Sequence, residues 1–223
     1  MDISRPLRAV LKKIWIDRGE KTHHFIHIPK NGGQSVRRAL ELNRAVSLGR
    51  PFHQRYRDVA ATLPDDMRYF CIVRNPWART ASRYMFGRQN AANWSEDDPR
   101  RIYILGASFD DYVRDQKVLP IPEYPGQPWM GPLSSWMNQL EWIMDEKGAI
   151  ACDCLRLEHL ESDISAYLNR SIHIRRRNKT RNSYDYREMF TDESAAIIGD
   201  LFKDDIDYFG FEFEGAAARN IAV

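Results

Sequence analysis

The chain has 223 residues, 43% of them hydrophobic and 12% aromatic, so it is long and apolar enough to fold around a substantial core. The formal net charge of +2 is too small to indicate nucleic-acid binding from the total alone. The three cysteines exclude a disulfide framework and favour a reducing, cytoplasmic compartment, and no apolar stretch approaches the roughly 20 residues of a membrane span.

Residues 1–22 form a basic amphipathic pattern that lacks the apolar centre of a signal peptide. We expect an arm that packs on the body of the protein or on a partner, with weak contact to a membrane surface as the alternative. The body is expected to be one domain over residues 23–213, followed by a C-terminal tail over residues 214–223.

The segment "FIHIPKNGGQSV" carries the first functional motif. Its apolar run, Phe25–Ile28, predicts a buried strand, and a helical pattern opens near Ser35, which we expect to cap the helix. A strand that turns through two glycines into a helix presents free backbone N–H groups and the positive end of the helix dipole, which suit a phosphate. An ordinary strand–helix turn with a surface lysine is the alternative, but Lys30, Gln34 and Ser35 together favour the phosphate site.

Three histidines, His23, His24 and His27, lie around this first strand. Strand alternation places His24 and His27 on opposite faces, and no carboxylate or cysteine is spaced to complete a ligand set. We therefore expect no metal site.

A second buried strand is predicted at Tyr69–Val73, and it ends in Arg74. A nucleotide triphosphatase would place a metal-binding aspartate there, and the chain also lacks the Gly-Lys pair of the usual phosphate loop. Lysine and arginine without a carboxylate suit an anion that is handled without Mg²⁺. Sulfuryl transfer fits, because the moving group carries less charge than a phosphoryl group.

The second half of the chain continues the alternation of strands and helices. A helix is expected from about Ser134 to Lys147, a strand over Ala149–Leu157, and a last helix from Thr191 or Asp192 to Gly210. Cys152 and Cys154 share a strand face and are expected to pack in the core. This order of elements predicts an α/β domain with a parallel sheet covered on both faces.

Two segments interrupt the alternation. Pro120–Pro132 holds five of the eleven prolines, so it is expected to be a long loop, either an acceptor-binding wall or a stiff connector. The basic run Arg175–Arg177 would bind a polyanionic acceptor or be a solvated edge.

Taken in order, the motifs resemble those of sulfotransferases that use 3′-phosphoadenosine 5′-phosphosulfate (PAPS). "FIHIPKNGGQSV" is similar to their 5′-phosphosulfate loop, and "CIVRNPWARTASRYMF" to their 3′-phosphate motif, in which a serine follows an arginine by eight residues. "DCLRLEHLESDI", "RRRNKTRNSYDYREMFTDE" and "DLFKDDIDYFGF" resemble late segments of the carbohydrate branch, which includes heparan sulfate 2-O-sulfotransferase, and of bacterial sulfotransferases.

The resemblance implies a role for each matching residue. Lys30 would contact the 5′-phosphosulfate and help the leaving phosphate depart, while Arg74 and Ser82 would hold the 3′-phosphate. Lys179 and Thr180 would close over the nucleotide. The loop residues that complete the cofactor site are Asn31, Gly32, Gly33, Gln34 and Ser35. The loop departs from the common Lys-Thr-Gly-Gly-Thr-Ser form at Asn31 and Gln34, which affects its fine geometry.

The reaction also needs a general base within hydrogen-bond reach of the acceptor hydroxyl. His53 lies in a polar loop between the first helix and the second strand, the interval in which the heparan sulfate 2-O branch carries its catalytic histidine. Glu41 is the second candidate, because other sulfotransferases use a glutamate.

The resemblance thus implies a P-loop-like sulfotransferase fold and a PAPS-dependent transfer to a hydroxyl, with a carbohydrate or glycoconjugate as the acceptor class. The product nucleotide would be adenosine 3′,5′-bisphosphate, and neither a metal ion nor a nucleic acid would be required. A small-molecule kinase is the rival enzyme class, and a nucleotide- or polyanion-binding module without catalysis is the rival outside enzymes.

Overall fold

Short parallel strands form the centre of the protein. The computed structural model describes residues 21–41, 43, 45–49, 53–115, 137–174 and 185–218. The described strands are β1 (His23–Ile26), β2 (Val46–Ser47), β3 (Arg68–Val73) and β4 (Asp153–Arg156). They build a four-stranded sheet in the order β2-β1-β3-β4, and each neighbouring pair is parallel. The parallel sheet predicted from the sequence is therefore confirmed.

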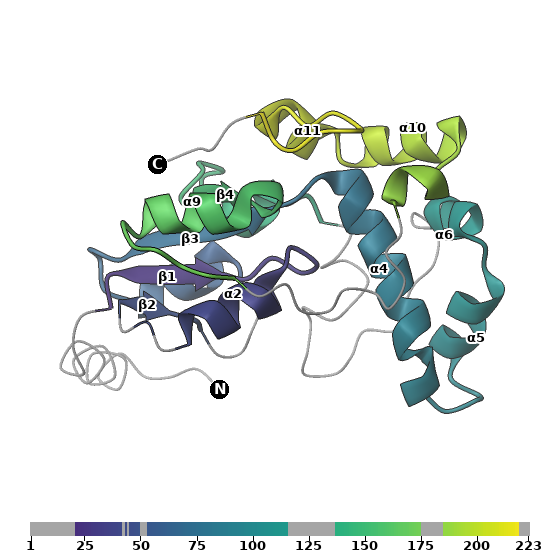
Figure 1. Ribbon diagram of the computed structural model, residues 1–223, viewed down its shortest axis with the longest axis horizontal. Coiled ribbons are helices and arrows are strands. Elements are labelled where there is room, and N and C mark those ends of the chain that lie inside the picture. The colour runs from purple at the N-terminus through teal and green to yellow at the C-terminus, as the bar shows by residue number, and fades with distance from the viewer. Residues whose placement is uncertain are drawn as a thin grey trace.

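Helices connect the strands and continue beyond them. They are α2 (Gly33–Leu40), α3 (Tyr56–Val59), α4 (Pro76–Asn90), α5 (Pro99–Gly106), α6 (Phe109–Asp115), α8 (Leu140–Ile143), α9 (Leu160–Tyr167), α10 (Asp192–Leu201) and α11 (Lys203–Phe209). Short 3₁₀ turns are η1 (Ala60–Thr62), η2 (Ala91–Asn93), η4 (Leu157–His159) and η5 (Tyr186–Met189). In Figure 1, α2 and α9 run alongside the strands, whereas α4, α5 and α6 lie beyond one end of the sheet.

Both faces of the sheet are buried. Phe25, Phe70 and Ile72 belong to a core cluster that includes residues of α2 and α9. Their strand neighbours, such as Ile26 and Cys71, belong to a second cluster with residues of α4, α8 and α10. The two clusters follow from the alternation of side chains along a strand, and burial on both faces is typical of a parallel sheet. The described residues form a single α/β domain.

The cysteines pack as expected. Cys71, Cys152 and Cys154 are free thiols in the core, each at most 1% exposed. At the other end of the domain, Ala217 is also buried, so at least this part of residues 214–223 packs on the body. Within the described ranges, no helix is both long and apolar enough to cross a membrane.

The predicted helix from Ser134 to Lys147 is wrong in extent. Its described part is helical only at α8, and the backbone becomes extended at Met144, which pairs with Ile150 as an antiparallel bridge. The Asp145 carboxylate accepts hydrogen bonds from the N–H groups of Lys147 and Ala149, which stabilises a turn in place of further helix. The following strand is accordingly shorter than predicted and begins at Asp153.

The predicted last helix is interrupted. Thr191 caps α10 as expected, and Gly210 ends α11 with φ +66°. Between them, Phe202 leaves the helical conformation and is buried. The interruption separates α10 from α11, whose first turn carries the fully buried Asp205.

Candidate functional site: a cationic junction at the ends of two strands

The two motifs meet at the carboxyl ends of neighbouring strands. In the sheet order β2-β1-β3-β4, β1 is followed by a strand towards one edge and β3 by a strand towards the opposite edge. The direction of the connections therefore reverses between β1 and β3, and the loops that follow these two strands flank that point. Ligands of open α/β sheets bind in the crevice at such a point. The guanidinium Nη1 of Arg74, at the end of β3, donates a hydrogen bond to the Lys30 carbonyl at 2.9 Å.

Neighbouring side chains leave no room for a Cβ at the two glycines of the first loop. Gly32 has φ +73°, and a Cβ there would lie 2.5 Å from a methyl carbon of Leu157. A Cβ on Gly33 would lie 1.9 Å from Nε2 of His27. The loop thus follows a path that only glycine allows, and its end forms the first turn of α2.

The cap of α2 differs from the prediction. Gly32 is the N-cap residue, so Ser35 does not cap the helix but stands at its third position. Gln34 is exposed and Ser35 is half-buried, so both lie where a ligand at the helix N-terminus would meet them.

Asn31 has a structural role that its place in the motif does not reveal. Its side chain is 1% exposed. The amide Nδ2 donates to the carbonyl of Ile72 and to Oε1 of Gln139, both at 2.6 Å. The side chain of Asn31 therefore connects the loop to β3 and to Gln139 through its Nδ2.

Positive charges gather where the two loops meet. Burial, together with the charges of Arg74 and Arg83, lowers the pKa of Lys30 to about 7. Arg79, on α4, is 2% exposed, and burial lowers its pKa to about 10 although Asp205 acts in the opposite direction. Cations that depress one another's protonation favour a bound anion, which would relieve the repulsion.

Ser82 lies on α4, about 9 Å along the helix axis from its first residue, Pro76, and is partly exposed. α4 itself begins because Oδ1 of Asn75 accepts hydrogen bonds from the N–H groups of Trp77 and Ala78, and Pro76 fits the first helical position. The strand, Arg74 and the helix carrying Ser82 thus form one continuous unit.

His53 lies beside the first loop. Its φ of +63° is in the left-handed region, as is the φ of +69° at Lys30. Among the described non-glycine residues, only Asn169 shares this property, and asparagine tolerates it well. Strained backbone of this kind concentrates at functional sites.

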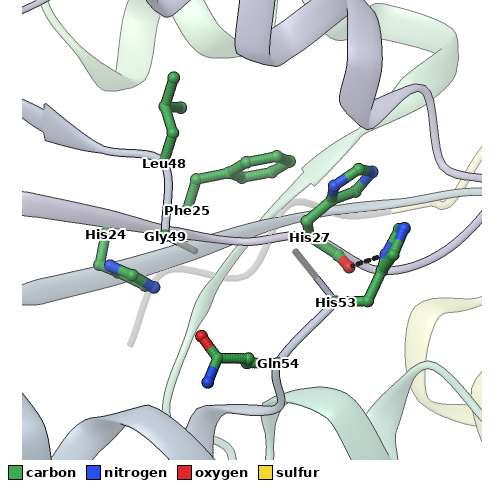
Figure 2. A pocket seen from close by; sticks show the side chains of 7 residues that line it. All are labelled: His24, Phe25, His27, Leu48, Gly49, His53 and Gln54. Carbon is green, nitrogen blue, oxygen red and sulfur yellow. Dashed lines mark hydrogen bonds between the residues drawn. The ribbon is translucent and has the colours of Figure 1, made fainter. Parts of the chain in front are cut away.

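The tautomer of His53 is fixed by one hydrogen bond. Nδ1 lies 2.9 Å from the carbonyl oxygen of His27 (Figure 2), and because a carbonyl only accepts, Nδ1 must carry the proton. In the neutral ring, Nε2 then holds the lone pair. The two imidazole rings also lie close, with their centroids 4.1 Å apart.

Burial lowers the pKa of His53, and the charges of Arg37 and Lys30 lower it further, although the hydrogen bond to His27 opposes this. The ring is therefore neutral near pH 7 and able to accept a proton at Nε2. Figure 2 shows His53 at one edge of a small pocket that His24, Phe25, Leu48 and Gln54 also line.

Glu41 is remote from this arrangement. It is exposed and stands at the C-terminal end of α2, about 12 Å along the helix axis from Gly33. Of the two candidate bases, only His53 lies near Lys30.

Several predicted features lie outside the described residues. These are Lys179, Thr180, the basic run 175–177, the proline-rich segment 120–132 and residues 1–20 of the arm. Within the described part of the chain, no three His, Cys, Asp or Glu side chains cluster as a metal site requires.

Sequence reasoning missed three residues at this junction: Arg79, Gln139 and Asp205. Arg79 donates to the carbonyls of Pro29 and Met137, and Gln139 and Asp205 are fully buried polar groups behind the loops. No motif contains Gln139. Asp205 lies in the segment "DLFKDDIDYFGF", where nothing in the sequence distinguishes it from the acidic residues beside it.

Comparison of the chain with protein-family models, curated proteins and solved structures finds no match in any of the three.

Proposed function

We propose that the protein is a PAPS-dependent sulfotransferase of the P-loop-like fold, which moves a sulfuryl group to a hydroxyl of a carbohydrate or glycoconjugate. The observation that carries the proposal is the junction of the two anion motifs, where Arg74 donates to the Lys30 carbonyl and both cations lie at the ends of neighbouring strands. A nucleotide with phosphate groups on both the 3′ and the 5′ oxygen of its ribose fits two adjoining cationic loops.

The residues present fit this cofactor, because they supply lysine, arginine and backbone N–H groups. Lys30, with the loop N–H groups up to Gln34 and the Ser35 hydroxyl, would hold the 5′-phosphosulfate, because the Ser35 N–H donates to the Gly32 carbonyl. Arg74 with Ser82 would hold the 3′-phosphate. When bound, PAPS supplies the sulfuryl group. Lys179 and Thr180 remain part of the proposed nucleotide site on the resemblance alone.

Proton transfer is assigned to His53. Its Nε2 would take the proton of the acceptor hydroxyl as the acceptor oxygen bonds to the sulfuryl group that PAPS supplies, with the phosphate of the nucleotide as the leaving group. The hydrogen bond from Nδ1 to the His27 carbonyl holds the tautomer and the ring orientation. Lys30 and the loop N–H groups would stabilise the negative charge on the leaving group, adenosine 3′,5′-bisphosphate.

A cytoplasmic location belongs to the same proposal, because the three cysteines are free thiols, as is usual in a reducing compartment. No observation favours the kinase alternative, since Arg74 follows β3 at the position where a carboxylate would hold Mg²⁺.

The proposal is tested by incubating the protein with ³⁵S-labelled PAPS and a panel of glycans in the presence of EDTA. Label on a glycan hydroxyl, lost in the Lys30→Ala variant, is the expected result. Transfer of phosphate from ATP that depends on Mg²⁺ would contradict it in favour of a kinase. Tight binding of adenosine 3′,5′-bisphosphate without transfer to any acceptor class would favour the non-catalytic module.

A further inference from the structure

Gln139 connects the two anion motifs from behind. It is fully buried, at 0% exposure, and lies just before α8. Its Oε1 accepts hydrogen bonds from Asn31 Nδ2 at 2.6 Å and from the Arg74 backbone N–H at 2.9 Å. One oxygen atom thus contacts the loop after β1 and the end of β3 at the same time.

The other half of the side chain completes a paired contact with Arg74. Nε2 of Gln139 donates to the Arg74 carbonyl at 2.9 Å, so the amide bonds both the N–H and the carbonyl of the same residue. The side-chain amide of Gln139 thus hydrogen-bonds to Arg74 as the backbone of a neighbouring strand would. It fixes the backbone of Arg74, and with it the starting point of its guanidinium.

Asp205 holds Gln139 in place from the opposite side. Its carboxylate is fully buried and accepts from the backbone N–H of Gln139 at 2.7 Å and of Leu140 at 3.0 Å. It also accepts from Nε2 of Gln139 at 3.1 Å. Gln139 therefore cannot rotate without leaving buried polar groups unsatisfied, which is costly.

Arg79 provides a second connection between the first loop and the segment before α8. The buried guanidinium of Arg79 donates through Nε to the Pro29 carbonyl at 3.3 Å and through Nη1 to the Met137 carbonyl at 3.0 Å. The segment from Met137 to Gln139 is thereby attached to both ends of the first loop, at Pro29 and at Asn31.

We propose that Gln139 is a positioning residue that sets the separation between the Lys30 loop and Arg74, so that one ligand with two phosphate groups can reach both. The inference rests on the proposed function and adds to it the residue that makes two anion sites act as one. Gln139 itself lies behind the loops and contacts no ligand.

The physical consequence is specific to ligands that span the two sites. A nucleotide with one phosphate, such as AMP, needs only the loop. The loop stays attached through Asn31 to the Ile72 carbonyl and through Pro29 to Arg79 when Gln139 is changed, so AMP is less sensitive to where Arg74 stands. Adenosine 3′,5′-bisphosphate needs both anchor points within a fraction of an ångström, because charge-assisted hydrogen bonds weaken quickly with distance and angle. Loosening Gln139 should therefore reduce the preference for the bisphosphate, not nucleotide binding in general.

The test compares Gln139→Glu and Gln139→Met with the wild-type protein. Glutamate keeps the shape and Oε1 but loses the donor to Arg74 and Asp205, and methionine keeps the volume but loses every hydrogen bond. Isothermal titration with adenosine 3′,5′-bisphosphate and with AMP gives the ratio of the two affinities. Gln89→Glu, at an exposed position on α4, is the matched control.

We expect both Gln139 variants to bind the bisphosphate at least about tenfold more weakly, AMP to change by less than about threefold, and the control to retain the wild-type ratio. A folded Gln139 variant with the wild-type ratio would overturn the inference. A wild-type protein that binds the two nucleotides equally would overturn the proposed function first, so the two failures are distinguishable.

If neither variant folds, amide hydrogen exchange of the wild-type protein provides the test. The Arg74 amide should be as strongly protected as the amides of β3 before any nucleotide is added, because its partner is the buried Gln139 side chain. Exchange as fast as that of an exposed loop would overturn the inference.

Discussion

Among single residues, the lowered pKa of Lys30 leads us to expect proton uptake when a nucleotide binds. Its pKa of about 7 results from burial and from the charges of Arg74 and Arg83. A bound anion raises the pKa again, so near pH 7 about half a proton should be taken up per nucleotide bound, and affinity should fall as the pH rises above 7. Calorimetry in two buffers of different ionisation enthalpy measures this uptake. Identical heats in both buffers would contradict the pKa of Lys30.

His53 allows a second test at the same scale. His53→Ala should lower turnover by about 10²–10⁴ while nucleotide affinity stays nearly unchanged. The wild-type rate should rise with pH and level off at a pH below 6.5, since burial lowers the pKa of His53 from that value. The matched control is His159→Ala, at an exposed position. Wild-type turnover in His53→Ala would remove the assignment of the base, although not the nucleotide site.

At the element scale, the turn from β1 into α2 depends on Gly33. A Cβ at this position would lie 1.9 Å from Nε2 of the buried His27, so Gly33→Ala must displace that ring. We expect a loss of about 1–3 kcal/mol in the free energy of unfolding, which exceeds the gain of up to about 1 kcal/mol in helix propensity. Urea denaturation measures the difference.

Gly106→Ala is the matched control for this prediction. No atom lies within 4 Å of the position its Cβ would take, so the change should be neutral or slightly stabilising. Equal effects of the two substitutions would contradict the role assigned to the His27 ring.

The elements themselves were predictable where local chemistry dominates. Phe25–Ile28 and Tyr69–Val73 read as buried strands because both faces of a parallel sheet are apolar, and each overlaps an observed strand. The helix expected up to Lys147 failed because Asp145 stabilises a turn by bonding two backbone N–H groups. The apolar spacing of that segment does not record this side-chain competition.

The site was predictable in part for the same reason. Lys30 and Arg74 each follow a strand, and they approach because β1 and β3 are neighbours in the sheet. The alternation of elements predicted parallel strands but not their order. Gln139 and Asp205 come from distant segments and meet behind the loops through folding alone. Their contacts depend on tertiary packing, for which a single sequence provides no periodicity or spacing.

At the scale of the whole molecule, buried histidines should govern stability in mild acid. Burial lowers the pKa of His24 to about 4 and that of His27 to about 2. Both folded-state values lie below the unfolded value of 6.5, so this stability is present above pH 6.5 and is lost as the pH falls below it.

Asp205 acts in the opposite direction, because burial raises its pKa to about 6 and its protonation stabilises the folded state as the pH falls. With about 1.4 kcal/mol per pH unit for each titrating group, His24, His27 and Asp205 together should cost about 2 kcal/mol between pH 7 and pH 5, and the lowered pKa of His53 adds to this loss. Urea denaturation at the two pH values checks this. His24→Phe should lessen the loss, and His173→Phe, at a side chain 77% exposed, should not. Unchanged stability at pH 5 would contradict the burial of His24 and His27 as neutral rings.

The most direct test of the central claim is a calorimetric comparison of adenosine 3′,5′-bisphosphate with AMP on the wild-type protein. Two adjoining anion sites predict that the bisphosphate binds more tightly by about 2–4 kcal/mol, from charge-assisted hydrogen bonds to the second phosphate. Arg74→Ala should remove most of this difference, and Mg²⁺ should change neither titration. Equal affinity for the two nucleotides would contradict the claim that the Lys30 loop and Arg74 form one nucleotide site.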